Sequence, residues 1–149
     1  MSGESRGSGP VGMPGPAEGY VVSEADALDG TLGFEVVEVG DEHVRGRVRV
    51  EDRIKQVYGL VHGGAYAALA EMLASEATVR AVWDDGSTAF GTAHEVKFLR
   101  QITEGTVHAE GRRIHRSRQM WVWDVDMTDD QGRLCASSRV TIAVRPRRD

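Results

Sequence analysis

The chain is short of cysteine and proline, and both shortages limit what it can be. Its 149 residues include a single cysteine, Cys135, which excludes an internal disulfide. The four prolines stand at positions 10, 14, 16 and 146, so the long stretch between them lacks the residue that most often interrupts helices and strands. No apolar run approaches the roughly 18 residues that a membrane-spanning helix needs, and the N-terminus lacks the apolar core of an export signal. We therefore expect a cytoplasmic protein with no membrane contact.

Charge and histidine spacing argue against two further classes of protein. The formal net charge is −5, so the chain as a whole is not built to hold nucleic acid. The histidines show no spacing typical of a metal site: they include His62, His94, His108 and His115. We expect neither a metal nor another cofactor. Three of the last five residues are arginine, which indicates either a solubilising tail or a patch for a phosphorylated ligand.

The order of apolar patterns predicts one domain with a single long helix. Residues 1–18 are rich in glycine, serine and proline and are expected to form a disordered leader, followed by one domain over 19–149. Asp29 and Gly30 indicate a turn. The predicted helix spans 63–83, and the predicted strands are 32–39, 44–50, 88–99, 105–115, 120–128 and 134–144.

This order determines the expected fold class. Strands that follow one another without intervening helices are mostly antiparallel, so the protein is predicted to be α+β, with an antiparallel sheet around one central helix. One helix cannot cover both faces and both edges of a six-stranded sheet. We therefore expect a homo-oligomer.

The start of the predicted helix carries the strongest functional signal. Gly63 and Gly64 open the only strongly apolar helix, which holds a carboxylate, Glu71, about two turns further on. Free backbone N–H groups at a helix start can bind a carbonyl oxygen that gains negative charge in a transition state. Ser75 lies one turn beyond Glu71 on the same face, and Gln56 precedes the glycine turn as a second donor. Together these residues indicate an acyl-transfer site.

Helix geometry restricts how this site can work. Gly63 and Glu71 are eight residues apart, which corresponds to about 12 Å along a helix. A carbonyl group is far shorter, so both can act on one reaction only if they come from different subunits. Each residue also has a simpler interpretation: the glycines as a turn, His62 as a cap or packing residue, Ser75 as a small packing residue. The ordering of these features along the chain favours the functional interpretation.

Residues 56–78 resemble the signature of the hotdog-fold acyl-CoA thioesterases, in which a sheet wraps a central helix. The runs GLVHGGAY at 59–66 and ALAEMLA at 68–74 are most similar to the 4-hydroxybenzoyl-CoA thioesterases that place a glutamate on this helix. The likeness extends through RIH at 113–115, WDV at 123–125, GRLCA at 132–136 and IAVRPRRD at 142–149. It covers nearly everything after about residue 28.

The resemblance implies roles for the catalytic residues. Glu71 attacks the thioester or activates water, the Gly63 N–H polarises the thioester carbonyl, and Gln56 assists at the carbonyl or the leaving group. Ser75 stands where the family usually has threonine and keeps the hydroxyl. His62 joins this catalytic set.

The resemblance also implies how substrate is bound. Asp29 and Glu76 match positions that contact the aromatic end of the acyl group, and Gly64 belongs with the substrate-binding residues. Arg100 and Arg148 match positions near the phosphates of coenzyme A. Arg118 and Gln119 are assigned to the same ligand, although the turn at 116–120 departs from the small, hydroxyl-rich turn of the family.

The resemblance thus implies hydrolysis of an aromatic acyl-CoA, with 4-hydroxybenzoyl-CoA as the expected substrate. A dimer is the expected catalytic unit and a tetramer the expected assembly. Two alternatives stay open: a thioesterase for another aryl- or arylacetyl-CoA, and a non-catalytic acyl-CoA-binding protein.

Overall fold

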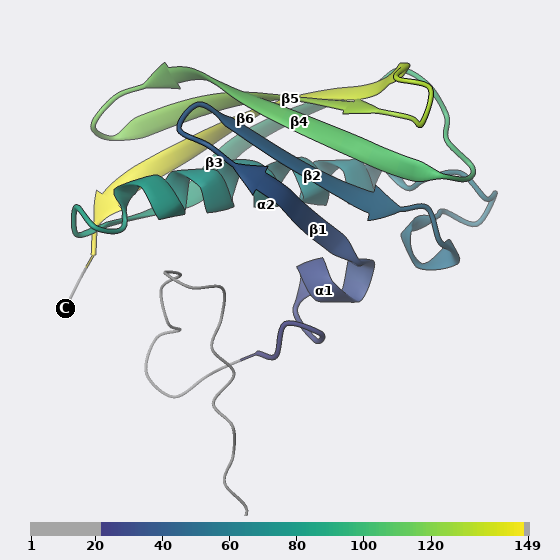
Figure 1. Ribbon diagram of the computed structural model, residues 1–149, viewed down its shortest axis with the longest axis horizontal. Coiled ribbons are helices and arrows are strands. Elements are labelled where there is room, and N and C mark those ends of the chain that lie inside the picture. Colours follow the sequence, from purple (N-terminus) through teal and green to yellow (C-terminus); the bar gives the residue numbers. More distant parts are fainter. Residues whose placement is uncertain (1–21, 148–149) are drawn as a thin grey trace, which may run out of the picture.

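The computed structural model describes residues 22–147 and contains one long helix and six strands (Figure 1). The helices are α1 (Leu28–Leu32), a 3₁₀ turn η1 (Asp52–Ile54) and α2 (Gly63–Val82). The strands are β1 (Phe34–Val39), β2 (His43–Arg49), β3 (Ser87–Phe98), β4 (Thr106–Arg116), β5 (Met120–Thr128) and β6 (Leu134–Pro146). No helix in this range is long and apolar enough to cross a membrane.

The six strands form one antiparallel sheet in the order β1-β2-β4-β5-β6-β3. The sheet curves over α2, which lies against its concave face (Figure 1). Strand β3, which follows α2 in the chain, lies at the opposite edge of the sheet from β1. The predicted α+β class and hotdog architecture are confirmed.

Two local predictions near the N-terminal part were wrong or incomplete. Asp29 and Gly30 lie within α1 and not in a turn, and Leu32 ends that helix before the first strand begins. A five-residue helix is too short to show helical periodicity in sequence. Gly33 ends it in the left-handed conformation, with φ 77°, and donates its N–H to the Asp29 and Gly30 carbonyls. The predicted leader, 1–18, lies outside the described residues.

The core lies between α2 and the concave face of the sheet. Strand β5 shows how the strand period of two creates it: Trp121, Trp123, Val125 and Met127 are buried against the helix, and the residues between them face outward. Close approach of helix and sheet requires small residues. A Cβ at Gly46 of β2 would lie only 2.6 Å from the Leu73 side chain, so glycine lets α2 rest directly on this strand.

A buried hydrogen bond also fixes α2 to the sheet. The Trp123 Nε1–H donates to Thr78 Oγ1 at 2.9 Å, and the Thr78 hydroxyl donates to the Ala74 carbonyl at 2.8 Å. Both Trp123 and Thr78 are fully buried. The pair sets how α2 is rotated over β5, because an unpaired indole N–H in this interior is costly.

We expect the Thr78→Val variant to unfold more easily than the wild type, by about 1–3 kcal/mol, because it leaves the buried indole N–H without an acceptor. Urea denaturation followed by tryptophan fluorescence measures this loss. Thr128→Val is the matched control, since Thr128 lies on the opposite face of β5. We expect its free energy of unfolding to change by less than about 0.5 kcal/mol. Equal losses in both variants would contradict a role for the Thr78 hydroxyl.

Candidate active site

The N-terminus of α2 presents a backbone donor. His62 is the N-cap, and its ring Nδ1 accepts the Gly64 N–H at 2.8 Å. The Ala65 N–H donates to the His62 carbonyl. Among residues 22–147 the Gly63 N–H has no hydrogen-bond acceptor, so it is available to a ligand. His62 is thus placed as a cap, and the Gly64 N–H is already used by that cap.

Gly63 is held tightly against the end of β3. A Cβ on this residue would lie 2.8 Å from the ring of Phe98, so glycine is needed for the helix start to pack here. The Phe98 ring in turn stacks near Tyr66, with ring centroids 6.1 Å apart. The helix start, Tyr66 and Phe98 therefore form one wall of the site.

Gln56 belongs to the loop that leads into the helix. Its backbone N–H donates to the Leu60 carbonyl at 2.8 Å, and its side-chain Oε1 accepts the Tyr58 N–H. Because the amide oxygen is engaged within the loop, the NH₂ group is the part that remains for a ligand. This arrangement suits the predicted donor role. Val57 and Tyr58 at the tip of the loop are almost fully exposed.

Glu71 lies half-buried in the middle of α2, against β3. A Cβ at Gly91 would lie 2.9 Å from Glu71 Oε1, so any side chain at position 91 would displace the carboxylate. Ser75 lies one turn further along α2 and is also half-buried. Sequence analysis missed Gly91, whose only signal was a glycine within a strand pattern, which often marks a close approach.

Three carboxylates gather around this part of α2. The pKa of Asp29 is raised, first by partial burial and then by the negative charges of Glu71 and Glu76. Short helix α1 therefore places Asp29 near the two glutamates of α2, and its acyl-binding role stays a prediction. Glu76 also forms an ion pair with Arg80 one turn later. Arg80 was not among the predicted site residues.

A second group of predicted residues meets at the other end of the molecule. Arg118 and Gln119, in the β4–β5 turn, line a cavity of about 330 Å³ with Arg145 of β6. The Arg145 Nη1–H donates to the Gln119 carbonyl at 3.0 Å. Nearby, the guanidinium carbon of Arg147 lies 3.6 Å from the centroid of the Trp83 ring. The backbone N–H of Arg147 donates to the Gly86 carbonyl. This corner therefore collects three arginines, two of which the sequence indicated only as part of a basic tail.

The structure separates other predicted residues. Arg100 follows the C-terminal end of β3, whereas Arg118 lies near Ser87 at its start. The 12-residue strand between them spans about 40 Å when extended, so one chain cannot bring both arginines to the same phosphate group. Arg148 lies outside the described residues.

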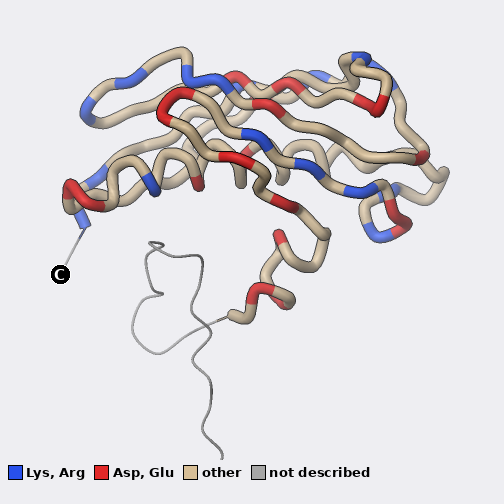
Figure 2. The backbone as a smooth tube through the Cα atoms, viewed as in Figure 1, with Lys and Arg blue, Asp and Glu red and all other residues tan. Residues whose placement is uncertain are grey.

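The convex face of the sheet is a different environment. Acidic and basic positions are interspersed along the strands of the sheet (Figure 2), and their side chains pair with one another, as Arg47 does with Glu35 and Arg139 with Asp124. The predicted catalytic residues instead lie on α2 and in the loop before it. The candidate site therefore lies on the helix side of the sheet.

The chain is similar to known thioesterases. Residues 58–136 match the family described as the Thioesterase superfamily. The proofreading thioesterase EntH of Cronobacter turicensis is 38% identical over 116 residues, which cover 76% of this chain and 82% of that protein.

Solved structures agree with this match. A variant of the thioesterase PA1618 from Pseudomonas aeruginosa superposes with a TM-score of 0.80 and 31% identity, covering 83% of this chain and 89% of that one. The thioesterase HI1161 from Haemophilus influenzae gives a TM-score of 0.78 and 29% identity, with coverage of 83% and 85%. With its hotdog fold and these relatives, the chain belongs to the thioesterase superfamily and is a thioester hydrolase.

Proposed function

We propose that the protein hydrolyses an aromatic acyl-CoA, with 4-hydroxybenzoyl-CoA as its substrate, to the carboxylic acid and free coenzyme A. The observation that carries this proposal is the position of the Glu71 carboxylate against Gly91 of β3, the strand whose Phe98 packs against Gly63 and its unpaired N–H. A carboxylate and an oxyanion donor are the two groups that thioester cleavage needs most.

The reaction divides between these groups. The Gly63 N–H binds the thioester oxygen and stabilises its growing negative charge. Glu71 either attacks the carbonyl carbon, forming an anhydride that water then hydrolyses, or takes a proton from water that attacks directly. In both routes the C–S bond breaks and coenzyme A leaves as its thiolate. Gln56 donates from its NH₂ group, and the Ser75 hydroxyl holds water near Glu71.

The acyl group is proposed to lie beside Asp29 and Glu76. Carboxylates accept a hydrogen bond from a phenol O–H, and their combined negative charge disfavours acyl chains that end in a carboxylate. Partial burial first, and then the negative charges of Glu71 and Glu76, raise the pKa of Asp29. A neutral aromatic acyl group with a hydroxyl donor fits these conditions.

The nucleotide end of coenzyme A is proposed to lie at the corner formed by Arg118, Arg145 and Arg147, with Gln119 beside them. Guanidinium groups suit phosphates because they donate in pairs. Arg100 and Arg148 are proposed to add to this charge. Since Arg100 lies at the far end of β3, its contribution to the same corner must come from a second subunit.

The catalytic unit is therefore proposed to be a dimer, which a tetramer would contain twice. Gly63 and Glu71 lie on one continuous helix, about 12 Å apart, so one chain cannot apply both to one carbonyl. Each complete site would take Gly63 and Gln56 from one subunit and Glu71 and Ser75 from the other.

Replacement of Glu71 tests the chemistry. We expect Glu71→Gln to lower kcat by about 10²–10⁴-fold with little change in KM, since the carboxylate acts mainly in the transition state. Glu110→Gln, an exposed carboxylate on the convex face, is the control and should keep wild-type turnover. The assay uses benzoyl-, 4-hydroxybenzoyl-, phenylacetyl- and aliphatic CoA thioesters. Near-normal turnover by Glu71→Gln would refute the catalytic role.

The same panel separates the alternative functions. If phenylacetyl-CoA is turned over fastest, the substrate is an arylacetyl-CoA and not 4-hydroxybenzoyl-CoA. Tight binding of acyl-CoA by the wild type without any turnover would identify a binding protein and refute the proposed reaction.

The arginine corner has its own test. We expect Arg118→Ala to raise KM for the CoA thioester about tenfold, as the loss of one charge-assisted hydrogen bond predicts. The same variant should leave KM unchanged for a pantetheine thioester, which lacks the nucleotide. Arg49→Ala, an exposed arginine at the end of β2, is the matched control. Equal effects on the two substrates would show that Arg118 does not bind the nucleotide.

Complementation tests the shared site. Gln56→Ala and Glu71→Gln are each expected to be inactive, but their heterodimer contains one intact site and one doubly altered site. Unfolding and refolding an equal mixture should therefore restore about a quarter of the wild-type activity for a symmetric dimer. Each variant refolded alone is the control. Verified heterodimers without activity would disprove the shared site.

A further inference from the structure

Helix α2 carries two carboxylates and one cation. Glu71 and Glu76 are its acidic residues, and Arg80, in its last turn, is its one basic residue. Arg80 Nη2 forms an ion pair with Glu76 Oε1, and the spacing of four residues places both side chains on the same helix face. The proposed reaction gives Arg80 no part, although this arginine contacts a residue of the proposed acyl pocket.

The carboxylate of Glu76 is largely withdrawn from water. Its side chain is 14% exposed, and the Arg80 side chain is 36% exposed. An ion pair between two fully exposed side chains contributes little, because water and salt screen it. A carboxylate that has lost most of its water depends more on its partner, since an unpaired charge in such a position is costly. The Glu76–Arg80 pair is therefore more than a surface contact.

Glu76 also lies in negative surroundings. Glu71 precedes it on α2, and Asp29 approaches from α1: the charges of both glutamates add to partial burial in raising the pKa of Asp29. Like charges close together repel one another. Within residues 22–147, Arg80 is the only cation in an ion pair with any of these three carboxylates. Arg80 therefore offsets the repulsion that Glu76 meets from the other two.

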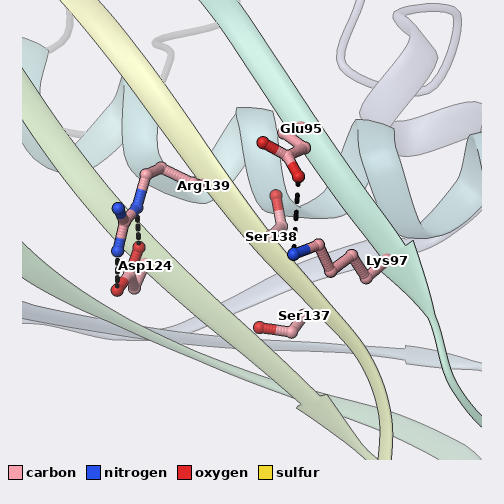
Figure 3. Close-up of a pocket in the computed structure, with 6 residues that line it drawn as sticks. All are labelled: Glu95, Lys97, Asp124, Ser137, Ser138 and Arg139. Atoms are coloured by element: carbon pink, nitrogen blue, oxygen red, sulfur yellow. Dashed lines mark hydrogen bonds and ion pairs between the residues drawn. The ribbon is translucent and has the colours of Figure 1, made fainter.

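The convex face contains a comparable pair away from the candidate site. Arg139 donates to both oxygens of Asp124, from Nε at 2.7 Å and from Nη2 at 2.9 Å (Figure 3). Above all, these hydrogen bonds lower the pKa of Asp124, against the opposite effect of burial. An arginine thus stabilises the ionised form of its partner carboxylate and fixes the direction of its oxygens. Arg80 stands in the same relation to Glu76.

The two oxygens of Glu76 differ in how they are engaged. Oε1 accepts from Arg80, whereas Oε2 has no hydrogen-bond donor in the part of the chain that the structure describes. A carboxylate oxygen with free lone pairs accepts a hydrogen bond from a ligand hydroxyl. By binding Oε1, Arg80 leaves Oε2 for a ligand and restricts rotation of the side chain.

We propose that Arg80 is a positioning residue that acts through Glu76 and makes the acyl pocket selective for acyl groups with a hydroxyl donor. This inference rests on the proposed function, which places the acyl group beside Asp29 and Glu76. A phenol O–H of the acyl group donates to Glu76 Oε2, and the guanidinium on Oε1 keeps the acceptor ionised and in place.

Helix geometry keeps Arg80 away from the reacting atoms. Arg80 follows Glu71 by nine residues, which corresponds to about 14 Å along the axis and about half a turn around it. Glu76 lies between the two along the helix. The effect of Arg80 on the substrate therefore passes through Glu76, and it concerns binding of the acyl group and not cleavage of the thioester.

Two substrates that differ only in the hydroxyl, 4-hydroxybenzoyl-CoA and benzoyl-CoA, test this inference. We expect Arg80→Met, which keeps an apolar stem, to raise KM for 4-hydroxybenzoyl-CoA about tenfold at unchanged kcat, as loss of a charge-assisted hydrogen bond predicts. KM for benzoyl-CoA should change by less than about twofold, because no hydroxyl is bound. Arg80→Lys keeps the cation and should restore most of the affinity. Arg139→Met, which breaks the convex-face pair, is the matched control and should leave both KM values unchanged.

A double-mutant cycle separates positioning from direct contact. Glu76→Gln alone should raise KM for 4-hydroxybenzoyl-CoA, and adding Arg80→Met should raise it by less than about twofold more, because the two residues act as one unit. A further tenfold rise in the double variant would show that Arg80 acts independently of Glu76 and would overturn the positioning role.

The remaining outcomes distinguish this inference from the proposed function. A wild type that does not prefer 4-hydroxybenzoyl-CoA to benzoyl-CoA would refute the proposed substrate, and the role of Arg80 with it. A wild type with that preference whose Arg80→Met variant keeps it would refute the role of Arg80 alone. Equal increases in KM for both substrates in Arg80→Met would show a general disturbance of α2 and would overturn the selectivity.

Discussion

The fixed rise of helix α2 is the constraint on which the rest of this structure depends. Gly63 and Glu71 belong to the same uninterrupted 20-residue helix, so their separation of about 12 Å cannot close by local adjustment. In the proposed mechanism a single chain therefore carries two half-sites and no complete one.

Glycines let the helix hold its functional groups against the sheet. Gly46 allows α2 to rest on β2, and Gly91 leaves room on β3 for the Glu71 carboxylate. Gly63 combines two roles, since it packs against Phe98 and leaves its N–H free. A Cβ at any of these positions would meet another side chain within 3 Å. A substitution at one of these glycines would therefore disturb the packing of α2 and, with it, the position of the proposed functional groups.

The two faces of the sheet divide structure from function. On the convex face, acidic and basic side chains pair within the chain and need no partner. On the concave face, Trp123 and Thr78 orient the helix through a buried hydrogen bond, and three carboxylates gather beside its middle. The ion pairs of the convex face thus lie apart from the groups proposed to act on the thioester. The charges beside those groups are the carboxylates proposed to bind the acyl group.

The sequence by itself determined the elements whose signals are local. The apolar helix predicted at 63–83 is α2 at Gly63–Val82, and the alternation of Trp121, Trp123, Val125 and Met127 with polar residues correctly placed β5. Only the tertiary structure decided that Gly91 lies under Glu71, that Asp29 lies beside both glutamates and that Arg118 meets Arg145. These contacts join residues from different elements, and periodicity within one element carries no information about which partner another element will present.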